Sequence, residues 1–268
     1  MARQYLGQHF LVDQGWRNRI FQSLPRRRTE TWIEIGAGHG EMTQLLAATE
    51  GRVIAVEKDA RLAAGLRNRL CLEPAQFPEV EIVVGDILKL DPTTFARDQF
   101  RVYGNLPYYI TSPILRHLFA FAQQIMSIHI VVQWEVAQRI VASPSRRAYG
   151  YLSAICQFYT RPEIVMGIPP GAFRPPPRVR SALVSMFLPG AGASVDVTDE
   201  RRFLKFVQLC FSQKRKTLRN NLRARFSEDL IRAGLAACEL GADTRAEQLS
   251  VAQFASLFGD LTGALRST

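Results

Sequence analysis

The chain has 268 residues, 47% of them hydrophobic, which is enough for a substantial core in one large domain or in a large domain with a small appendage. The formal net charge of +10 indicates a polyanionic partner, although an anionic membrane surface would give the same signal. No apolar run is long enough to span a membrane, and the N-terminal segment lacks a signal-peptide core, so we expect a cytoplasmic protein without a membrane partner.

Short apolar runs alternate with amphipathic segments along the first half of the chain. The runs typical of strands are Trp32–Gly36, Arg52–Val56, Val80–Val84, Arg101–Gly104 and Ile128–Gln133. Segments with helical periodicity lie near residues 41–48, 59–70, 112–122 and 134–142. This alternation predicts an α/β fold with a parallel sheet and helices on both of its faces.

Two further apolar runs, Glu163–Ile168 and Ser181–Leu188, are separated only by a proline-rich loop. The loop is too short for a crossover helix, so we expect an antiparallel hairpin at one edge of the sheet. After Leu188 the segment PGAGAS is typical of a linker, and the residues that follow have helical periodicity. The predicted domains are therefore residues 1–189 and a smaller helical domain, residues 190–268.

The four cysteines are far apart in the sequence and have apolar neighbours. They are Cys71, Cys156, Cys210 and Cys238, and none belongs to a CxxC pair. We interpret them as reduced core residues of a cytosolic protein and expect no metal site.

A glycine-rich turn, Glu34–Gly40, follows the first predicted strand. Its GxGxG spacing differs from the GxGxxG of dinucleotide-binding turns, but its glycines equally allow the backbone to approach a ligand. Glu57 closes the second strand, where a carboxylate can bind a ribose diol, and Asp86 follows the third, where an acid can bind an adenine edge. These acids, with Gly36 and Gly38, predict an adenosine-shaped site, in which Glu34 helps to position the turn or the amino end of the cofactor.

The segment Asn105–Tyr109 has the sequence NLPYY and follows the fourth predicted strand. The Asn105 side-chain oxygen can accept a hydrogen bond from an exocyclic amine, Pro107 has a fixed φ and no N–H, and Tyr108 offers a stacking face. By itself the segment is equally compatible with a strand-to-helix turn that ends at a proline. Its place beside the predicted adenosine site favours a loop that holds a flat nitrogen heterocycle.

Several motifs, in this order and spacing, resemble those of class I S-adenosylmethionine-dependent methyltransferases, and more narrowly those of the KsgA/RsmA branch of the rRNA adenine N6,N6-dimethyltransferases. They are GQHFLVD, EIGAGHG, VEKD, GDIL, NLPYYITSP, YGYLSAICQFY and AFRPPPRVRSA, and the resemblance covers roughly residues 3–225. It implies a Rossmann-like fold with a mostly parallel seven-stranded sheet, one antiparallel edge strand and a small C-terminal α-helical domain.

The resemblance also implies an activity, a cofactor and a substrate. S-adenosyl-L-methionine would be the methyl donor, and N6 of two adjacent adenosines near the 3′ end of 16S rRNA, in the immature small ribosomal subunit, would be the acceptor. The cofactor site implied by the family contains His9, Leu11, Gly36, Glu57, Asp86 and Asn105. We expect a monomer, because no interface signature is visible in the sequence.

The implied catalytic residues lie in two loops. The Asn105 side-chain oxygen and the Leu106 carbonyl would accept the two N6 hydrogens of the target adenine, and positioning would supply much of the rate. Tyr108, after Pro107, would stack on the target base, and Phe173 would supply its second face. Simple core packing is the alternative for Phe173.

Every charged side chain between Arg201 and Arg225 is basic, which favours contact with RNA phosphates over a merely solvated face. Arg26–Arg28 and Arg146-Arg147 are expected to extend this surface. Phosphate contacts position an RNA but do not identify its sequence.

Other functions remain open at the level of the sequence. A nicotinamide dehydrogenase could share the sheet topology, although the GxGxG spacing and the NLPY loop argue against it. A ribosome assembly factor could retain the fold, with or without catalysis. The Erm branch, which modifies 23S rRNA and usually carries Ile where this chain has Leu106, differs chiefly in its target. The eukaryotic Dim branch is conceivable, but the short termini favour a bacterial enzyme.

Overall fold

The fold is taken from a computed structural model, which describes residues 9–25, 30–48, 51–71, 79–96, 98–107 and 109–263. The chain divides into two compact units. One is formed by Met1–Ala137 with Glu163–Leu188, and the other by Gln138–Pro162 with Pro189–Thr268. Residues 138–162, which the sequence placed in the first domain, therefore belong to the second unit.

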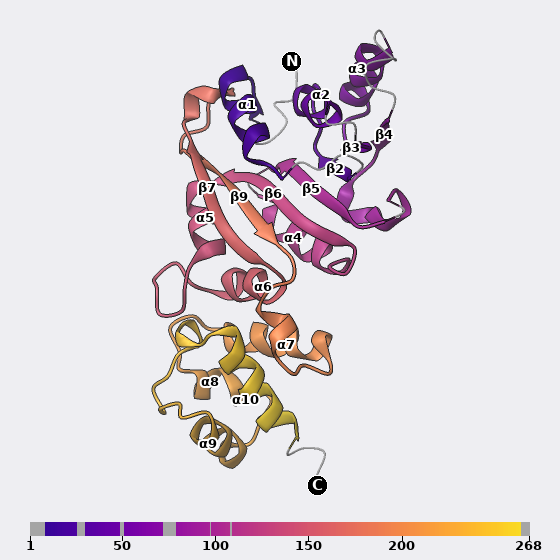
Figure 1. The fold of residues 1–268 in the computed structure, drawn as a ribbon. Helices are drawn as coiled ribbons and strands as arrows, with labels where there is room; N and C mark the ends of the chain where they lie inside the picture. Colours follow the sequence, from indigo (N-terminus) through magenta and orange to yellow (C-terminus); the bar gives the residue numbers. More distant parts are fainter. Residues whose placement is uncertain are drawn as a thin grey trace. The chain divides into compact units, whose positions relative to one another are not determined.

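The first unit is built on a seven-stranded sheet with the order β4-β3-β2-β5-β6-β9-β7 (Figure 1). Its strands are β2 (Thr31–Ile35), β3 (Val53–Glu57), β4 (Val80–Val84), β5 (Phe100–Asn105), β6 (Ile125–Gln133), β7 (Arg161–Ile168) and β9 (Ser181–Phe187). Strands β2 to β6 pair in parallel, and β9 is antiparallel to β6. The predicted hairpin strands, β7 and β9, are neighbours at one edge.

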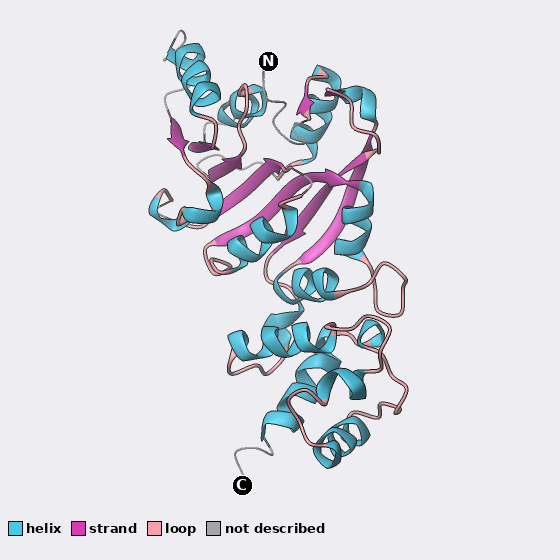
Figure 2. Ribbon diagram, turned by 180° about the vertical axis from the view of Figure 1, so that it is seen from behind, coloured by secondary structure: helices cyan, strands magenta, loops and turns pink. Residues whose placement is uncertain are grey.

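Helices flank the sheet, as the alternating pattern predicts. They are α1 (Gln14–Ser23), α2 (Glu41–Ala47), α3 (Ala60–Cys71), α4 (Thr111–Phe119) and α5 (Trp134–Val141). Apolar side chains of α1 and α2 share one core cluster with Trp32 of β2 and Tyr103 of β5. Helix α4 crosses in front of the strands in Figure 2. The predicted strands and helices of this part agree with the structure to within a few residues, except that α1 was not predicted.

A switch in strand order lies between β2 and β5. The chain builds β2, β3 and β4 outward in one direction and then returns to place β5 on the other side of β2. Because the connections diverge there, a crevice opens at the carboxyl ends of the strands, which is where ligands bind in sheets of this kind.

A short antiparallel ribbon lies outside the main sheet. It pairs β1 (Phe10–Leu11) with β8 (Phe173–Arg174), in the register Phe10 with Arg174 and Leu11 with Phe173. The backbone N–H groups of Val12 and Asp13 both donate to the Ala172 carbonyl, at 3.0 and 3.2 Å. The ribbon thus joins the start of the chain to the proline-rich loop.

The second unit is helical. Its helices are α6 (Tyr151–Tyr159), α7 (Glu200–Cys210), α8 (Leu218–Leu222), α9 (Glu228–Ala237) and α10 (Val251–Gly263). Phenylalanine rings fill its interior: the Phe203 ring lies 5.1 Å from that of Phe158 and 5.6 Å from that of Phe258. The buried Tyr149 hydroxyl donates to the Leu249 carbonyl at 2.8 Å, which ties the segment before α6 to the segment before α10.

The segment PGAGAS, expected to be a linker, begins at the boundary between the two units and is closely packed in the structure. Ala191–Ser194 form a 3₁₀ turn, and a Cβ on Gly190 would lie 2.2 Å from the Thr160 backbone nitrogen. A Cβ on Gly192 would lie 2.7 Å from the Phe158 carbonyl oxygen. These small residues therefore allow close packing on the end of α6, a role that composition alone does not distinguish from a flexible connection.

Further 3₁₀ turns occur at Ile87–Lys89, Pro92–Thr94, Pro170–Ala172 and Ala246–Gln248. In the described ranges, no helix combines the length and the apolar character needed to cross a bilayer.

Candidate functional site

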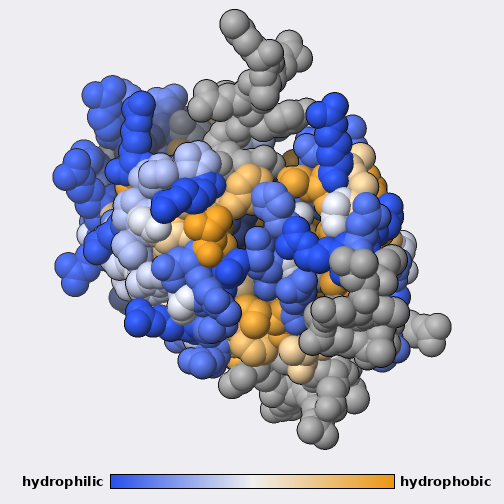
Figure 3. All heavy atoms as spheres, turned by 90° about the horizontal axis from the view of Figure 1, so that it is seen from above, coloured by the Kyte–Doolittle hydropathy of each residue, from blue (hydrophilic) through white to orange (hydrophobic). Residues whose placement is uncertain are grey.

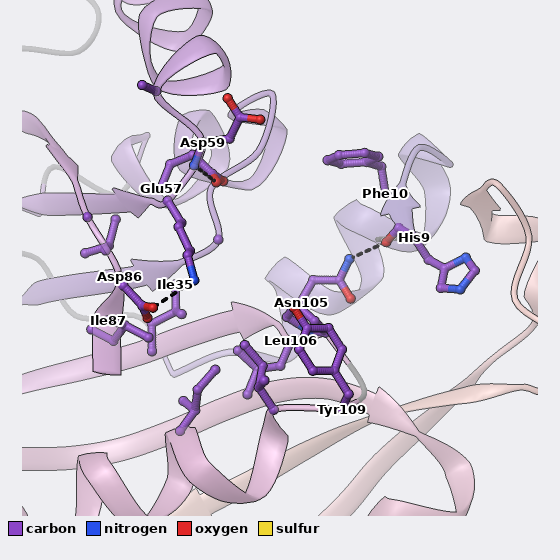
Figure 4. Close-up of a pocket in the computed structure, with 18 residues that line it drawn as sticks. His9, Phe10, Ile35, Glu57, Asp59, Asp86, Ile87, Asn105, Leu106 and Tyr109 are labelled. Atoms are coloured by element: carbon purple, nitrogen blue, oxygen red, sulfur yellow. Dashed lines mark hydrogen bonds and ion pairs between the residues drawn. The ribbon is translucent and has the colours of Figure 1, made fainter. Parts of the chain in front are cut away.

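A cavity of about 500 Å³ opens at the carboxyl ends of β2, β3 and β5, beside the turn that follows β4. This volume is typical of sites for small organic ligands. Figure 4 shows Glu57 and Asp86 on one side of the cavity and His9, Phe10 and Asn105 on the other. The face seen in Figure 3 shows several separate apolar patches with hydrophilic side chains between them.

The glycine turn between β2 and α2 shapes the wall of the cavity. Gly36 lines it with φ +75°, and a Cβ there would meet no atom within 4 Å, so the bare backbone faces open space. Gly40 has φ +85°, and a Cβ would lie 2.1 Å from Leu66 Cδ1. Both conformations strongly favour glycine, and together they allow the turn to pass close to a ligand.

Glu57 is the last residue of β3 and is only 4% exposed, yet it lines the cavity. One carboxylate oxygen accepts the Gly38 N–H at 2.8 Å, and the other accepts the Asp59 N–H at 2.9 Å. These bonds fix the carboxylate and tie the glycine turn to β3. Gly38 contributes to the site through this N–H and is not itself in the cavity lining.

Asp86 faces the cavity from the turn after β4. Its Oδ1 accepts the Leu88 N–H at 3.1 Å, and its Oδ2 accepts Lys58 Nζ at 2.8 Å. The hydrogen bond from Lys58 is the main cause that lowers the pKa of Asp86 below its usual value. Because the Lys58 side chain is 76% exposed, this ion pair is weak, and a ligand amine can compete for the same oxygen.

Asn105 ends β5 at the far side of the cavity and is half-buried. Its Nδ2 donates to the His9 backbone carbonyl at 2.9 Å. Since a carbonyl can only accept, this bond identifies the amide nitrogen and leaves Oδ1 as the acceptor on the other branch of the amide. Leu106 and Pro107 also line the cavity, and the Leu106 N–H donates to Val131 O at 3.1 Å.

The structure brings together most of the predicted site residues but not all. The predicted residues that line the cavity are His9, Gly36, Glu57, Asp86, Asn105, Leu106 and Pro107. Leu11 and Glu34 are buried outside it. Tyr108 lies outside the described residues.

The stacking role expected for Phe173 is corrected by the structure. Its side chain is 0% exposed and belongs to the core cluster that contains Leu11 and Ile20. Pairing of β8 with β1 turns this ring inward, so it offers no face to a base in the cavity. Phe173 instead packs in the core, which was the alternative interpretation of this residue from the sequence.

Further residues that the sequence analysis did not single out also line the cavity, among them Phe10, Lys58 and Tyr109. A Cβ on Gly38 would lie 3.3 Å from the Phe10 ring, so Phe10 packs over the glycine turn. Tyr109 is 68% exposed at the edge of the cavity. Each of the three directly follows a predicted site residue in the sequence. Their position next to those residues is therefore the signal that could have identified them.

Several known proteins resemble this chain along most of its length. The family model described as ribosomal RNA adenine dimethylase matches residues 1–262. A protein of Acidobacterium capsulatum named ribosomal RNA small subunit methyltransferase A is 40% identical over 259 residues, which cover 96% of this chain and 90% of that protein. A protein of the same name from Xanthomonas euvesicatoria is 39% identical over 257 residues, covering 96% and 95%.

Two solved structures share the fold over nearly the whole chain. The 23S rRNA methyltransferase ErmE has a TM-score of 0.72 at 25% identity and covers 94% of this chain and 99% of its own. A dimethyladenosine transferase from Plasmodium falciparum has a TM-score of 0.78 at 21% identity and covers 95% and 98%. The predicted class I methyltransferase fold is thereby confirmed.

Proposed function

The chain belongs to the ribosomal RNA adenine dimethylase family, and we propose that it transfers methyl groups from S-adenosyl-L-methionine to N6 of two adjacent adenosines near the 3′ end of 16S rRNA. The observation that carries this proposal is the single cavity edge at which Asn105 and Leu106 face Glu57 and Asp86. Asn105 and Leu106 suit an adenine amine as methyl acceptor, and Glu57 and Asp86 suit an adenosine cofactor.

The residues of the cavity fit the cofactor. Glu57, held by two backbone N–H groups, presents a fixed carboxylate for a ribose diol, and Asp86 presents one for an adenine amine. Gly36 leaves room for close approach of the ligand. When bound, S-adenosyl-L-methionine supplies an electrophilic methyl group on a sulfonium centre. His9, which lies beside Asn105 across the cavity from Glu57, is proposed to flank the cofactor from the N-terminal segment, and Leu11 supports that segment from the core.

Asn105 and Leu106 activate the acceptor. The adenine amine is a poor nucleophile because its lone pair is delocalised into the ring. The Asn105 Oδ1 and the Leu106 carbonyl accept its two N–H hydrogens and draw the nitrogen toward tetrahedral geometry, which exposes the lone pair. No strong base is required, since the methylated amine is acidic and loses its proton afterwards. Orientation supplies much of the rate.

Pro107 and Tyr108 complete the proposed catalytic loop. Pro107 fixes its own φ, which aims the preceding carbonyl, and Tyr108 is proposed to stack on the target base. Extracting that base from its stack costs a few kcal/mol unless it already lies in a loop.

RNA is proposed to contact the second unit through the basic segment of residues 201–225. Lys214, Arg215 and Lys216 are exposed in the turn between α7 and α8. Arg146 and Arg147, in the same unit, are also exposed. Arg26–Arg28, expected to extend this surface, lie outside the described residues. The proposed substrate is the immature small subunit, on which the enzyme acts as a monomer in the cytoplasm.

A direct test offers the purified protein radiolabelled S-adenosylmethionine with two substrates that lack the modifications: immature small subunits and 23S rRNA. We expect label in the small subunit, recovered as N6,N6-dimethyladenosine. Label only in 23S rRNA would instead assign the activity of the ErmE-like relatives, and label in neither would refute the proposed substrate. Binding of immature subunits by a transfer-inactive variant would show an assembly role as well.

A further inference from the structure

His9 connects the acceptor loop to the proline-rich loop through two hydrogen bonds. Its backbone carbonyl accepts Asn105 Nδ2 at 2.9 Å, the contact drawn as a dashed line in Figure 4. Its ring Nδ1 lies 2.6 Å from the Pro175 backbone carbonyl oxygen. His9 is therefore in contact with two segments that are distant from it and from each other in the sequence.

The donor and the acceptor are fixed in both hydrogen bonds of His9, because a carbonyl oxygen accepts and never donates. Asn105 must place its NH₂ toward His9, so its Oδ1 takes the opposite branch of the amide. The His9 ring must carry a proton on Nδ1 to bond to Pro175. A neutral His9 in this geometry is consequently the Nδ1–H tautomer.

The His9 backbone is held in place by the β1–β8 ribbon that begins with the next residue. Leu11 and Phe173 face each other in that ribbon and are buried in the core cluster. The Ala172 carbonyl accepts two N–H groups from the residues just after β1. The carbonyl that Asn105 meets thus belongs to a backbone anchored at several points.

We propose that His9 is a positioning residue for methyl transfer: its carbonyl orients the Asn105 amide so that Oδ1 faces the acceptor, and its imidazole ties this carbonyl to the Pro175 loop. The inference rests on the proposed function for the role of Oδ1. It gives His9 a task beyond flanking the cofactor, and it explains why Phe173 is buried: the ring anchors the ribbon that carries His9.

The kinetic test compares His9→Ala, His9→Leu and His9→Asn. Loss of the Pro175 bond removes the anchor nearest the His9 carbonyl. Because a small misplacement of a reacting group is costly, we expect His9→Ala and His9→Leu to lower the single-turnover rate at least about tenfold. His9→Asn keeps an N–H donor and should retain the rate within about threefold. The Kd for S-adenosylhomocysteine should stay within about twofold in all three.

His117→Ala is the matched control, because His117 Nε2 also bonds a backbone carbonyl, Leu90 O at 2.8 Å, but does not line the cavity. It should leave the rate unchanged. A Kd that rises in step with the loss of rate would show that His9 only binds the cofactor. A normal rate in His9→Ala, or no recovery in His9→Asn, would also overturn the proposal.

A second measurement needs neither variants nor substrate. Nitrogen-15 NMR of the labelled wild-type protein in mildly alkaline buffer should show a proton on His9 Nδ1. An Nε2–H tautomer would refute the bond to Pro175. Failure of the wild type to methylate any rRNA would instead refute the proposed function and leave the NMR result standing.

Discussion

Glu34 and Glu57 lie at the ends of neighbouring strands, yet their carboxyl groups have different environments. Glu57 is the terminal residue of β3 and reaches the cavity, whereas Glu34 precedes the last residue of β2 and points into the core. There the Thr43 hydroxyl of α2 donates to it. Burial, with smaller contributions from Glu41 and Glu57, raises the pKa of Glu34 to about 8 despite that bond. The alternation of side chains along β2 therefore removes Glu34 from direct contact with the ligand.

The raised pKa of Glu34 predicts a pH dependence of stability. From about pH 4.5 to about 8 the folded protein keeps a proton that the unfolded chain releases. The stabilisation is thus fully present below about pH 4.5 and is lost as the pH rises toward 8. Glu34→Gln lacks this proton equilibrium. The free energy of unfolding of the wild type, minus that of Glu34→Gln, should fall by at most roughly 1 kcal/mol per pH unit.

Urea denaturation of both proteins at about pH 5.5, 6.5 and 7.5 measures that difference, in which other titrating groups cancel. If the free energy of unfolding of the wild type, minus that of Glu34→Gln, stays constant or rises with pH, Glu34 is ionised in the folded protein.

At the scale of elements, a buried polar network joins three strands of the sheet. Arg101 of β5 donates to both carboxylate oxygens of Glu30, at 2.8 and 2.9 Å, and to Ser127 of β6 at 2.8 Å. His129 bonds Ser127 and, across to β9, Ser185, each at 2.8 Å. Burial and the nearby Arg101 lower the pKa of His129 to about 3, so the ring stays neutral. The network supplies partners for polar groups that are buried along these strands.

Arg101→Met should destabilise the protein by about 3–5 kcal/mol, because it leaves the Glu30 carboxylate almost buried without a counter-charge. The double variant Arg101→Met/Glu30→Met removes both charges and should recover most of that loss. Chemical denaturation of the wild type and both variants measures this. If the single and double variants lose the same free energy of unfolding, the stabilisation comes from packing of the Arg101 side chain and not from the ion pair.

The elements that could be predicted from the sequence are those with their own periodic pattern of apolar and polar residues. The runs at 80–84 and 134–142 correspond closely to β4 and α5, since burial of one face imposes the pattern locally. The β1–β8 ribbon has only two residues per strand, and its partners are over 160 residues apart, so it leaves no periodic signal. For the same reason the sequence could not decide between stacking and core packing for Phe173, and it did not predict the contact of His9 with Asn105. Motif spacing located Glu57, Asp86 and Asn105 because each ends a strand of one parallel sheet or lies in the turn just after it.

At the scale of the whole molecule, the excess positive charge is not evenly available to RNA. Within the basic segment, Arg219 and Arg223 both pair with Glu228 of α9, and their hydrogen bonds lower its pKa. No ion pair with a described acid involves Lys214, Arg215 or Lys216. We therefore expect the turn between α7 and α8 to release more counterions on RNA binding than the two paired arginines.

Replacing Lys214, Arg215 and Lys216 together with Ala should weaken RNA binding and reduce the slope of log K against log salt concentration by roughly 2 to 3. Arg232→Ala is the control, since Arg232 is exposed in the same unit but pairs with Asp229. Filter binding of immature small subunits over a range of salt concentrations measures the slope. An unchanged slope in the triple variant would exclude these side chains from the RNA interface.

Asn105 is proposed to prepare an adenine amine of 16S rRNA for methyl transfer. The most direct test is mass spectrometry of the 16S 3′-end fragment from a bacterium that lacks its own dimethyltransferase and expresses either the wild type or Asn105→Ala. We predict two adjacent N6,N6-dimethyladenosines with the wild type and none with Asn105→Ala, while the purified variant stays folded. Full modification by Asn105→Ala would contradict the role proposed for Asn105, and an unmodified fragment with the wild type would contradict the proposed activity.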